Sequence, residues 1–134
     1  MEWPLHYKLK VRSYDLDSFG HVNNAVYLNY LEEARCDYME QHGLNFNNFE
    51  QWKAYAFVVS TEIKYKAPAR YGEVLDIRGR FSGNKRSSFF IEYQLFNTTT
   101  NRVCAEAKMM FAFVNEHEKL IPIPQEFREK MGME

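Results

Sequence analysis

Apolar and polar residues alternate along most of the chain, and this alternation predicts a protein rich in β-strands. Residues 5–14 alternate with a period of two, which is typical of a half-buried strand. Four later segments share this period, and their apolar positions are Tyr55, Phe57, Val59, Ile63 and Tyr65, then Leu75, Ile77 and Phe81, then Phe89, Ile91, Tyr93 and Leu95, and finally Val103, Ala105, Ala107, Met109, Phe111 and Phe113. Pro, Gly and Asn residues separate the segments, as hairpin turns require.

The period changes to that of a helix between the first strand and the second. From Ala25 to about Gln41, apolar residues recur at helical spacing, at positions Leu28, Leu31, Ala34, Tyr38 and Met39. A shorter helical turn is expected around residues 46–52, and the tail after Pro124 is expected to form a closing helix. The pattern therefore predicts one strand, one long helix and four further strands.

This order of elements is typical of an α+β fold. The long helix carries apolar residues around much of its circumference, so we expect it to be covered on more than one side. An antiparallel sheet that curls around the helix would cover it in this way. The edges and outer face of such a sheet need partners, which favours a homo-oligomer. We expect residues 1–134 to form a single domain.

The net charge of −1 argues against broad electrostatic binding to nucleic acid or to an anionic membrane. No apolar run approaches the ~20 residues that cross a bilayer, and the N-terminal residues contain no signal-peptide core. Cys36 and Cys104 are far apart in sequence and match no metal or disulfide pattern, so reduced thiols are expected. These features predict a soluble, cytoplasmic protein.

The break between the first strand and the long helix carries the most specific motif in the chain. Residues 14–30 include the pattern Asp-x-x-Gly-His-Val-Asn-Asn-x-x-Tyr, which begins at Asp17 and ends at Tyr27. This motif resembles the signature of the hotdog-fold thioesterases of the 4-hydroxybenzoyl-CoA thioesterase type. Residues 63–75 are similar to that family's second-strand turn, so that the resemblance covers nearly the whole chain.

The resemblance implies the hotdog fold, in which a curved, antiparallel five-stranded sheet wraps around a long central helix. It implies hydrolysis of an acyl-CoA to a carboxylic acid and free CoA, without a cofactor. It also implies a homodimer whose two active sites lie across the subunit interface, and often a tetramer of such dimers. The family's catalytic acid falls on Asp17.

Physical chemistry agrees with a catalytic role for Asp17. Thioester hydrolysis needs a group that attacks the carbonyl carbon or activates water, and donors for the oxygen that becomes negative. Asp17 supplies a carboxylate just before the helix, as nucleophile or as general base. The first helical turn has backbone N–H groups without helical partners, and the expected substrate contacts there are Asn24, Ala25, Val26 and Tyr27. Gly20 allows a close approach of substrate to the loop or an unusual φ, whereas Asp15 is expected to be solvated.

Two pairs of polar residues have open roles. His21 and Asn23 are candidates to orient water or substrate, although local packing and helix capping also explain them. We place both in the expected catalytic set. Glu32 and Glu33 lie on the helix, where one branch of the family carries its acid; an exposed face or an ion pair with Arg35 is the alternative.

Binding of CoA requires positive charge beside its phosphates. Lys85 and Arg86, at a predicted hairpin, are the preferred phosphate contacts. Lys64, Lys66 and Arg70 flank an earlier strand and turn, and they are the second group of candidates. Solvated turn charges are the alternative interpretation for both groups.

Motifs of other enzyme classes are absent from the sequence. It contains no GxSxG, Walker or GxGxxG motif, and its histidines show no metal-ligand spacing, so no cofactor and no metal are expected. Two other functions are open on the same fold: a hydratase or dehydratase that pairs Asp17 with His21, and a module that binds acyl-CoA without turnover. An acyl carrier protein in place of CoA is also compatible with the sequence.

Overall fold

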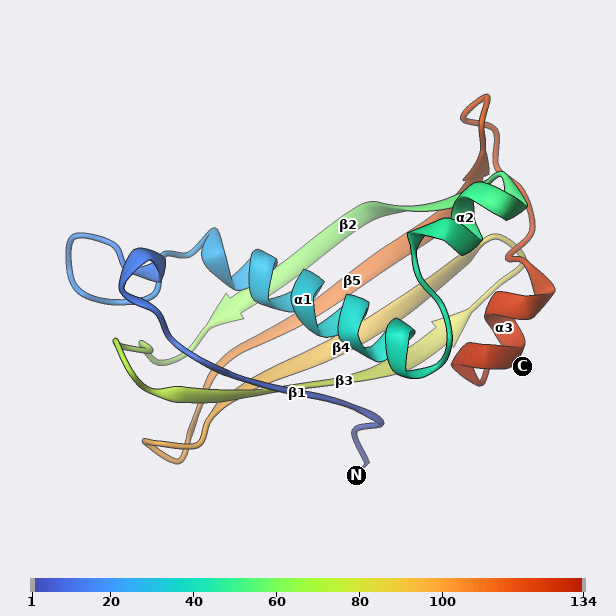
Figure 1. The fold of residues 1–134 in the computed structure, drawn as a ribbon. Coiled ribbons are helices and arrows are strands. Elements are labelled where there is room, and N and C mark those ends of the chain that lie inside the picture. The colour runs from blue at the N-terminus through green and yellow to red at the C-terminus, as the bar shows by residue number, and fades with distance from the viewer. Residues whose placement is uncertain (1, 134) are drawn as a thin grey trace.

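A computed structural model describes residues 2–133 of the protein (Figure 1). The strands are β1 (Leu5–Lys10), β2 (Ala54–Tyr65), β3 (Val74–Asn84), β4 (Ser88–Asn97) and β5 (Arg102–Asn115). The helices are α1 (Val26–Gln41), α2 (Phe46–Trp52) and α3 (Gln125–Met131), and a 3-10 turn, η1, spans Ser13–Asp15. The predicted order of one strand, one long helix and four further strands is confirmed.

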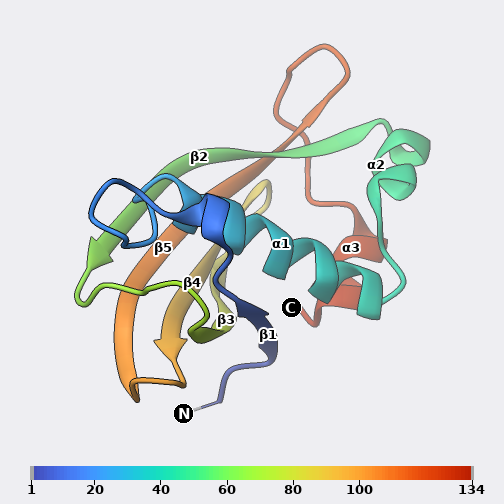
Figure 2. The same ribbon diagram turned by 60° about the vertical axis from the view of Figure 1, so that its left-hand side comes forward.

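The strands form one five-stranded antiparallel sheet in the order β1-β3-β4-β5-β2. Figure 1 and, from a second direction, Figure 2 show that this sheet curves around α1. The second and third helices lie near the C-terminal end of α1, while the loop between β1 and α1 lies at the opposite end of the molecule. The predicted α+β arrangement, a long helix wrapped by a curved sheet, is confirmed.

The core lies between the inner face of the sheet and α1. All the apolar positions predicted for β4 are buried, and alternate positions of β5 from Ala105 to Phe113 are buried with them. α1 adds the buried residues Tyr27, Tyr30, Leu31 and Ala34. Phe49 of α2 and Phe127 of α3 contact each other and Phe113 by their rings, so the core continues under both short helices.

The alternation predicted for residues 55–65 fails at a β-bulge. The register of β2 against β5 shifts between Val58 and Ser60. An extra residue in one strand reverses which side chains face inward beyond it, because the side-chain period of a strand is two. Phe57, Val58 and Val59, at this shift and just before it, are 45%, 45% and 47% exposed. The prediction that the odd positions of residues 55–65 form one continuous apolar face is therefore wrong, because the bulge interrupts the alternation.

The ends of two elements, β1 and α1, differ from the predictions. β1 ends at Lys10 and not near residue 14, because residues 13–15 turn into η1. α1 begins at Val26, one residue later than predicted. α2 has the predicted bounds, and the side chain of Asn45 caps it by accepting from the N–H of Asn47. α3 forms the predicted closing helix.

Both cysteines are unbridged, as predicted, with Cys36 partly buried and Cys104 fully buried. Burial raises the pKa of the Cys104 thiol to about 11, so the thiol stays protonated at neutral pH. Within residues 2–133, no helix is both long enough and apolar enough to cross a membrane.

Candidate active site

The loop that joins β1 to α1 closes on itself around Asp17. Leu16 and Val22 form an isolated antiparallel bridge across its base. Inside this bridge the N–H of Asp17 donates to the carbonyl of His21 at 2.8 Å, and the N–H of Gly20 donates back to the carbonyl of Asp17 at 3.1 Å. Gly20 has a φ of +74°, which a glycine adopts without strain. The loop is therefore a tight, hydrogen-bonded turn.

This turn holds one oxygen of the Asp17 carboxylate. Oδ1 accepts from the N–H of Phe19 at 2.9 Å and from the N–H of His21 at 3.2 Å. Among residues 2–133, no group donates a hydrogen bond to Oδ2. The side chain is thus fixed through one oxygen, while the other oxygen is available to a ligand or to water.

Asp17 lines an open hollow of about 340 Å³, formed by the start of α1 and the end of β2. The other lining residues are His21, Val22, Asn24, Tyr27, Tyr65, Lys66, Ala67 and Pro68. The Tyr65 hydroxyl donates to the carbonyl of Asn24 at 3.0 Å, and its ring centre lies 5.4 Å from that of Tyr27. The structure therefore brings together Asp17, His21, Asn24 and Tyr27, four of the expected site residues.

Some backbone N–H groups at the start of α1 are hydrogen-bonded within the protein, and others are not. Asn23 occupies two of them, because its Oδ1 accepts from the N–H of Ala25 and its carbonyl accepts from the N–H of Val26, each at 2.9 Å. The N–H groups of Asn24 and Tyr27 have no acceptor within the described part of the chain. Two unpaired donors therefore lie at the positive end of the helix, and both residues line the hollow that contains Asp17.

The imidazole of His21 faces Arg70 and does not pair with the Asp17 carboxylate. Its backbone bridges that of Arg70, and Nε2 of His21 lies 3.4 Å from Nη2 of Arg70. The neighbouring N–H of Val22 donates to the carbonyl of Ala69 at 2.8 Å, which ties the Asp17 loop to the segment between β2 and β3. Within residues 2–133, no hydrogen bond joins the His21 imidazole to the Asp17 carboxylate.

Asp15 is buried, so the prediction that it is solvated is wrong. Its Oδ2 accepts from the Tyr30 hydroxyl at 2.6 Å, and from the N–H and Nε of Arg12 at 3.0 and 3.1 Å. Burial alone would raise the pKa of Asp15, but these hydrogen bonds and the Arg12 charge hold it below its ordinary value. Burial and the Asp15 carboxylate raise the pKa of Tyr30. The sequence carried no local signal for this contact, because Asp15 and Tyr30 belong to different elements.

Lys85 and Arg86 lie at the opposite end of the molecule from the Asp17 loop. They occupy the turn between β3 and β4, which packs beside α3 in Figure 1. The N–H of Ile123 donates to the carbonyl of Arg86 at 2.8 Å. One chain therefore does not bring this pair together with Asp17.

Glu32 and Glu33 each form an ion pair outside the hollow at Asp17. Glu32 pairs with Arg35 at 3.4 Å, as predicted for the alternative role, and Glu33 pairs with Arg12 at 3.6 Å. Neither glutamate lines the hollow.

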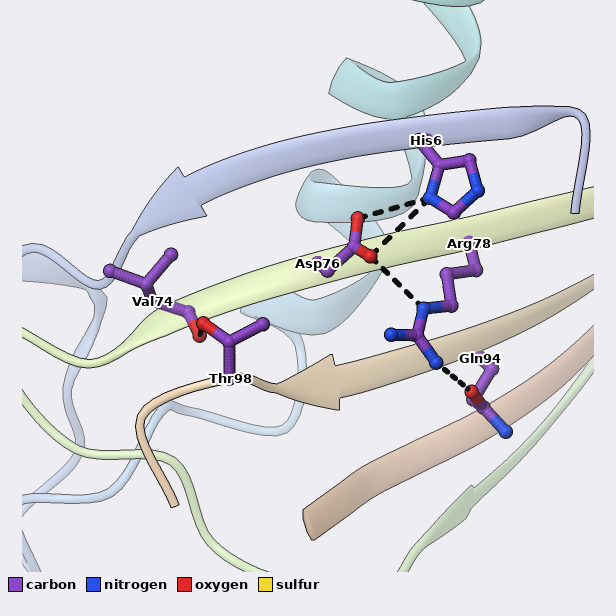
Figure 3. Close-up of polar contacts among 6 residues, drawn as sticks. All are labelled: His6, Val74, Asp76, Arg78, Gln94 and Thr98. Atoms are coloured by element: carbon purple, nitrogen blue, oxygen red, sulfur yellow. Dashed lines mark hydrogen bonds and ion pairs between the residues drawn. The ribbon is translucent and has the colours of Figure 1, made fainter. Parts of the chain in front are cut away.

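A second polar cluster lies on the face of the sheet opposite α1, as Figure 3 shows. Asp76 of β3 accepts from Nε of Arg78 at 3.0 Å and lies 3.3 Å from Nδ1 of His6. Arg78 in turn donates to Gln94 of β4 at 2.9 Å. The cluster links three strands and does not line the hollow at Asp17. Across residues 2–133, no group of three or more His, Cys, Asp or Glu side chains could hold a metal ion.

Comparisons with known proteins agree with this architecture. Residues 11–131 match the model of the thioesterase-like superfamily. The long-chain acyl-CoA thioesterase FadM of Escherichia coli K12 is 34% identical over 128 residues, which cover 92% of this chain and 94% of the relative. The chloroplastic acyl-acyl carrier protein thioesterase ATL3 of Arabidopsis thaliana is 29% identical over 92% of this chain, and the chain spans 65% of its length.

The solved structures support the same assignment. A thioesterase from Thermus thermophilus, complexed with coenzyme A and Zn, matches with a TM-score of 0.82 and 28% identity, over 96% of this chain and 92% of that chain. The predicted membership in a thioester-hydrolase family is confirmed. The chain belongs to the thioesterase-like superfamily and has the hotdog fold.

Proposed function

We propose that the protein hydrolyses the thioester of an acyl-CoA, or of an acyl carrier protein, to a carboxylic acid and a free thiol. The observation that carries this proposal is the Asp17 carboxylate, held by one oxygen and open at the other, in one hollow with Asn24 and Tyr27. The names of its relatives support the same reaction, since FadM is named for acyl-CoA and ATL3 for acyl carrier protein.

The unpaired N–H groups of Asn24 and Tyr27 are the proposed donors to the thioester oxygen. That oxygen becomes negative as the carbonyl carbon turns tetrahedral, and fixed backbone donors stabilise it without reorganisation. The helix N-terminus adds a positive potential. Ala25 and Val26 are weaker candidates than the sequence indicated, because Asn23 already accepts from their N–H groups. Asn23 thereby acts on the geometry of the donors, and not on the substrate.

Two routes are open to Asp17, and both need only water. As a nucleophile, its carboxylate attacks the carbonyl carbon and expels the thiolate, and water then hydrolyses the resulting anhydride. As a general base, it takes a proton from the water that attacks the same carbon. Mass spectrometry of enzyme quenched during turnover separates the routes, because only the first leaves an acyl group on Asp17.

We place the phosphates of CoA near Arg70 and Lys66. Both belong to the segment that borders the hollow at Asp17, and Arg70 is exposed beside His21. Lys66 also pairs with Glu106 at 3.3 Å, so part of its charge is already compensated. Arg70 is therefore the main proposed contact.

We further propose a homodimer that forms through the edge of β2. Within residues 2–133 this strand pairs with β5 alone, and its other edge runs past Phe57 and Val59, each nearly half exposed. The opposite edge strand, β1, carries exposed charged residues at Lys8 and Lys10. Natural sheets protect free edges with lysines, whereas an apolar edge is a template for pairing with another chain. Sedimentation measurements distinguish the dimer from the monomer and from a tetramer of dimers.

A panel of acyl-CoAs, aliphatic and aromatic, tests the proposed reaction. Release of thiol, followed with a colour reagent, supports hydrolysis. A change of ultraviolet absorbance without thiol release would support a hydratase or dehydratase instead; the missing Asp17–His21 pair counts against that function. Binding without either signal would support a non-catalytic module.

The single-domain organisation and the cytoplasmic location expected from the sequence stay predictions. Limited proteolysis tests the first, because one domain resists cleavage as a unit. Cell fractionation tests the second.

A further inference from the structure

A second cavity lies beneath the C-terminal half of α1, and the reaction proposed above makes no use of it. Its volume is about 120 Å³, and it is more enclosed than the hollow at Asp17. Its lining is mostly apolar and includes Cys36 and Met39 of α1, Ala56 and Val58 of β2, and Phe111 of β5. It extends towards α2 and α3 and contains none of the residues around Asp17.

The two hollows lie at opposite ends of the same pair of elements. α1 and β2 run in opposite directions, as Figures 1 and 2 show, so the start of α1 lies beside the end of β2. Tyr27 contacts Tyr65 at the end near Asp17, whereas Met39 and Ala56 share the cavity at the other end. A chain-like ligand that followed α1 and β2 would therefore lead from the first hollow to the second.

One face of α1 connects these ends. Leu28, Glu32, Arg35 and Met39 follow each other at helical spacing, so their side chains lie on one face of the helix. The last three line the cavity, and Leu28 is 40% exposed one turn nearer to Asp17. The helix packs most closely against β1 and β3, at the other edge of the sheet from β2. An exposed apolar side chain thus lies between the hollow and the cavity.

Arg35 does not turn the cavity into an anion site. Its Nη1 donates to the Tyr93 hydroxyl at 3.2 Å and lies 3.3 Å from Sδ of Met109. Its guanidinium stacks over Phe111, 5.0 Å from the ring centre, and its Nη2 pairs with Glu32 at 3.4 Å. The other basic lining residue, Arg80, pairs with Glu92 at 2.7 Å. Because both cations are engaged by protein groups, the surface left to a ligand is mostly aliphatic and aromatic.

The length of α1 sets which ligands can reach the cavity. At 1.5 Å per residue, Glu32 lies about 7 Å and Met39 about 18 Å along the helix axis from Tyr27. An extended covalent chain advances about 3.5 Å for every three bonds, so about six bonds reach Glu32 and about fifteen reach Met39. A short acyl chain ends before the cavity, while a chain of about sixteen carbons fills it.

We propose that this cavity binds the tail of a long, unbranched aliphatic acyl chain whose thioester lies at Asp17. The inference rests on the proposed hydrolysis for the position of the thioester. It makes the side chains of Ala56 and Cys36 determinants of chain length, although neither touches the reacting atoms.

The tail site is tested by substitutions that fill the cavity from two sides, one on β2 and one on α1. Ala56→Leu enlarges the β2 wall and Cys36→Leu the α1 wall, and Gln51→Leu on the exposed face of α2 is the matched control. For each variant, kcat/KM is measured with hexanoyl-CoA and palmitoyl-CoA, and thermal melting checks the fold. We expect each filled variant to lose about tenfold or more with palmitoyl-CoA, because each displaced methylene costs binding. Turnover of hexanoyl-CoA stays at the wild-type value, and Gln51→Leu changes neither.

A binding measurement keeps this test independent of turnover. Palmitate displaces the fluorescent fatty acid cis-parinaric acid from the wild type, and both filled variants bind the probe less well than Gln51→Leu does. Equal losses with hexanoyl-CoA and palmitoyl-CoA, or unchanged probe binding in the filled variants, would overturn the tail site while leaving hydrolysis intact. Probe binding that the filled variants lose, in a protein that releases no thiol, would keep the tail site and reject the hydrolase.

Discussion

The hydroxyl of Tyr30 donates a hydrogen bond of 2.6 Å to Oδ2 of Asp15, across the buried junction between α1 and the turn that precedes Asp17. Tyr30 is fully buried and Asp15 is 3% exposed. Arg12 completes the junction through its N–H and its guanidinium. These contacts fix the turn around Asp15 to α1. Asp17 lies two residues further along the chain, so its loop is held close to the N-terminus of that helix.

Tyr30→Phe tests the strength of this junction. The substitution removes one buried hydrogen bond to a charged acceptor and leaves the ring in place, so we expect the free energy of unfolding to fall by about 1.5–3 kcal/mol. Urea denaturation measures the change. Tyr71→Phe, at an exposed tyrosine, is the control and should leave stability unchanged. Equal stability of the two variants would show that the Tyr30 hydroxyl does not anchor the loop.

The depressed pKa of Asp15 predicts how stability depends on pH. The folded-state pKa lies below the unfolded value of about 3.9, so the ionised carboxylate stabilises the fold above that pH. This contribution is lost as the pH falls through the folded-state pKa. Wild type should therefore be more stable than Asp15→Asn at neutral pH, and the difference should shrink in acid. Unfolding curves that stay parallel from neutral to acidic pH would contradict the assignment.

The proposed dimer interface at the edge of β2 can be tested by placing a charge on that edge and measuring the oligomeric state. Val59→Lys introduces a lysine at the bulge of the free edge, and we expect the sedimenting species to shift towards the monomer because a buried unpaired charge opposes edge pairing. Lys8→Glu on the opposite edge strand changes a charge without exposing an apolar edge, and it should leave the mass unchanged. A monomeric wild type, or a dimer that Val59→Lys leaves intact, would reject this interface.

Substrate affinity distinguishes the two groups of basic residues. Arg70→Gln should raise KM for an acyl-CoA by about two- to fivefold, the range of one exposed ion pair, with little effect on kcat. The effect should weaken at high salt, because the contact is exposed to solvent. Lys85→Gln should leave KM unchanged if phosphate contacts come from the same chain as Asp17. The reverse result would place the phosphates at the hairpin between β3 and β4 of a partner subunit.

Elements with an uninterrupted period were predictable from the sequence. β4 alternates without a break, so the burial of Phe89, Ile91, Tyr93 and Leu95 follows from its pattern. Residues 46–52 form α2 because a capping asparagine precedes a regular helical stretch. The motif from Asp17 to Tyr27 likewise predicted four residues that share one hollow.

Features that depend on tertiary contacts were not predictable in this way. The buried contact of Asp15 depends on Tyr30 in another element, and the bulge after Val58 depends on pairing with β5. The distance of Lys85 from Asp17, by contrast, could have been predicted from the direction of the strands. β3 runs antiparallel to β1, so it begins beside the Asp17 loop and ends at the far side of the sheet, where the hairpin lies.

The most direct measurement is kcat/KM of Asp17→Asn with the acyl-CoA that the wild type hydrolyses best. The amide keeps the oxygen that accepts from Phe19 and His21, so the loop and the melting temperature should be preserved. Asp37→Asn, at an acid whose side chain accepts from Gln41 on the surface of α1, is the control. We expect Asp17→Asn to lose about 10²- to 10⁴-fold in kcat/KM while Asp37→Asn loses nothing. A folded Asp17→Asn variant with undiminished turnover would contradict the account and would assign the chemistry to another residue.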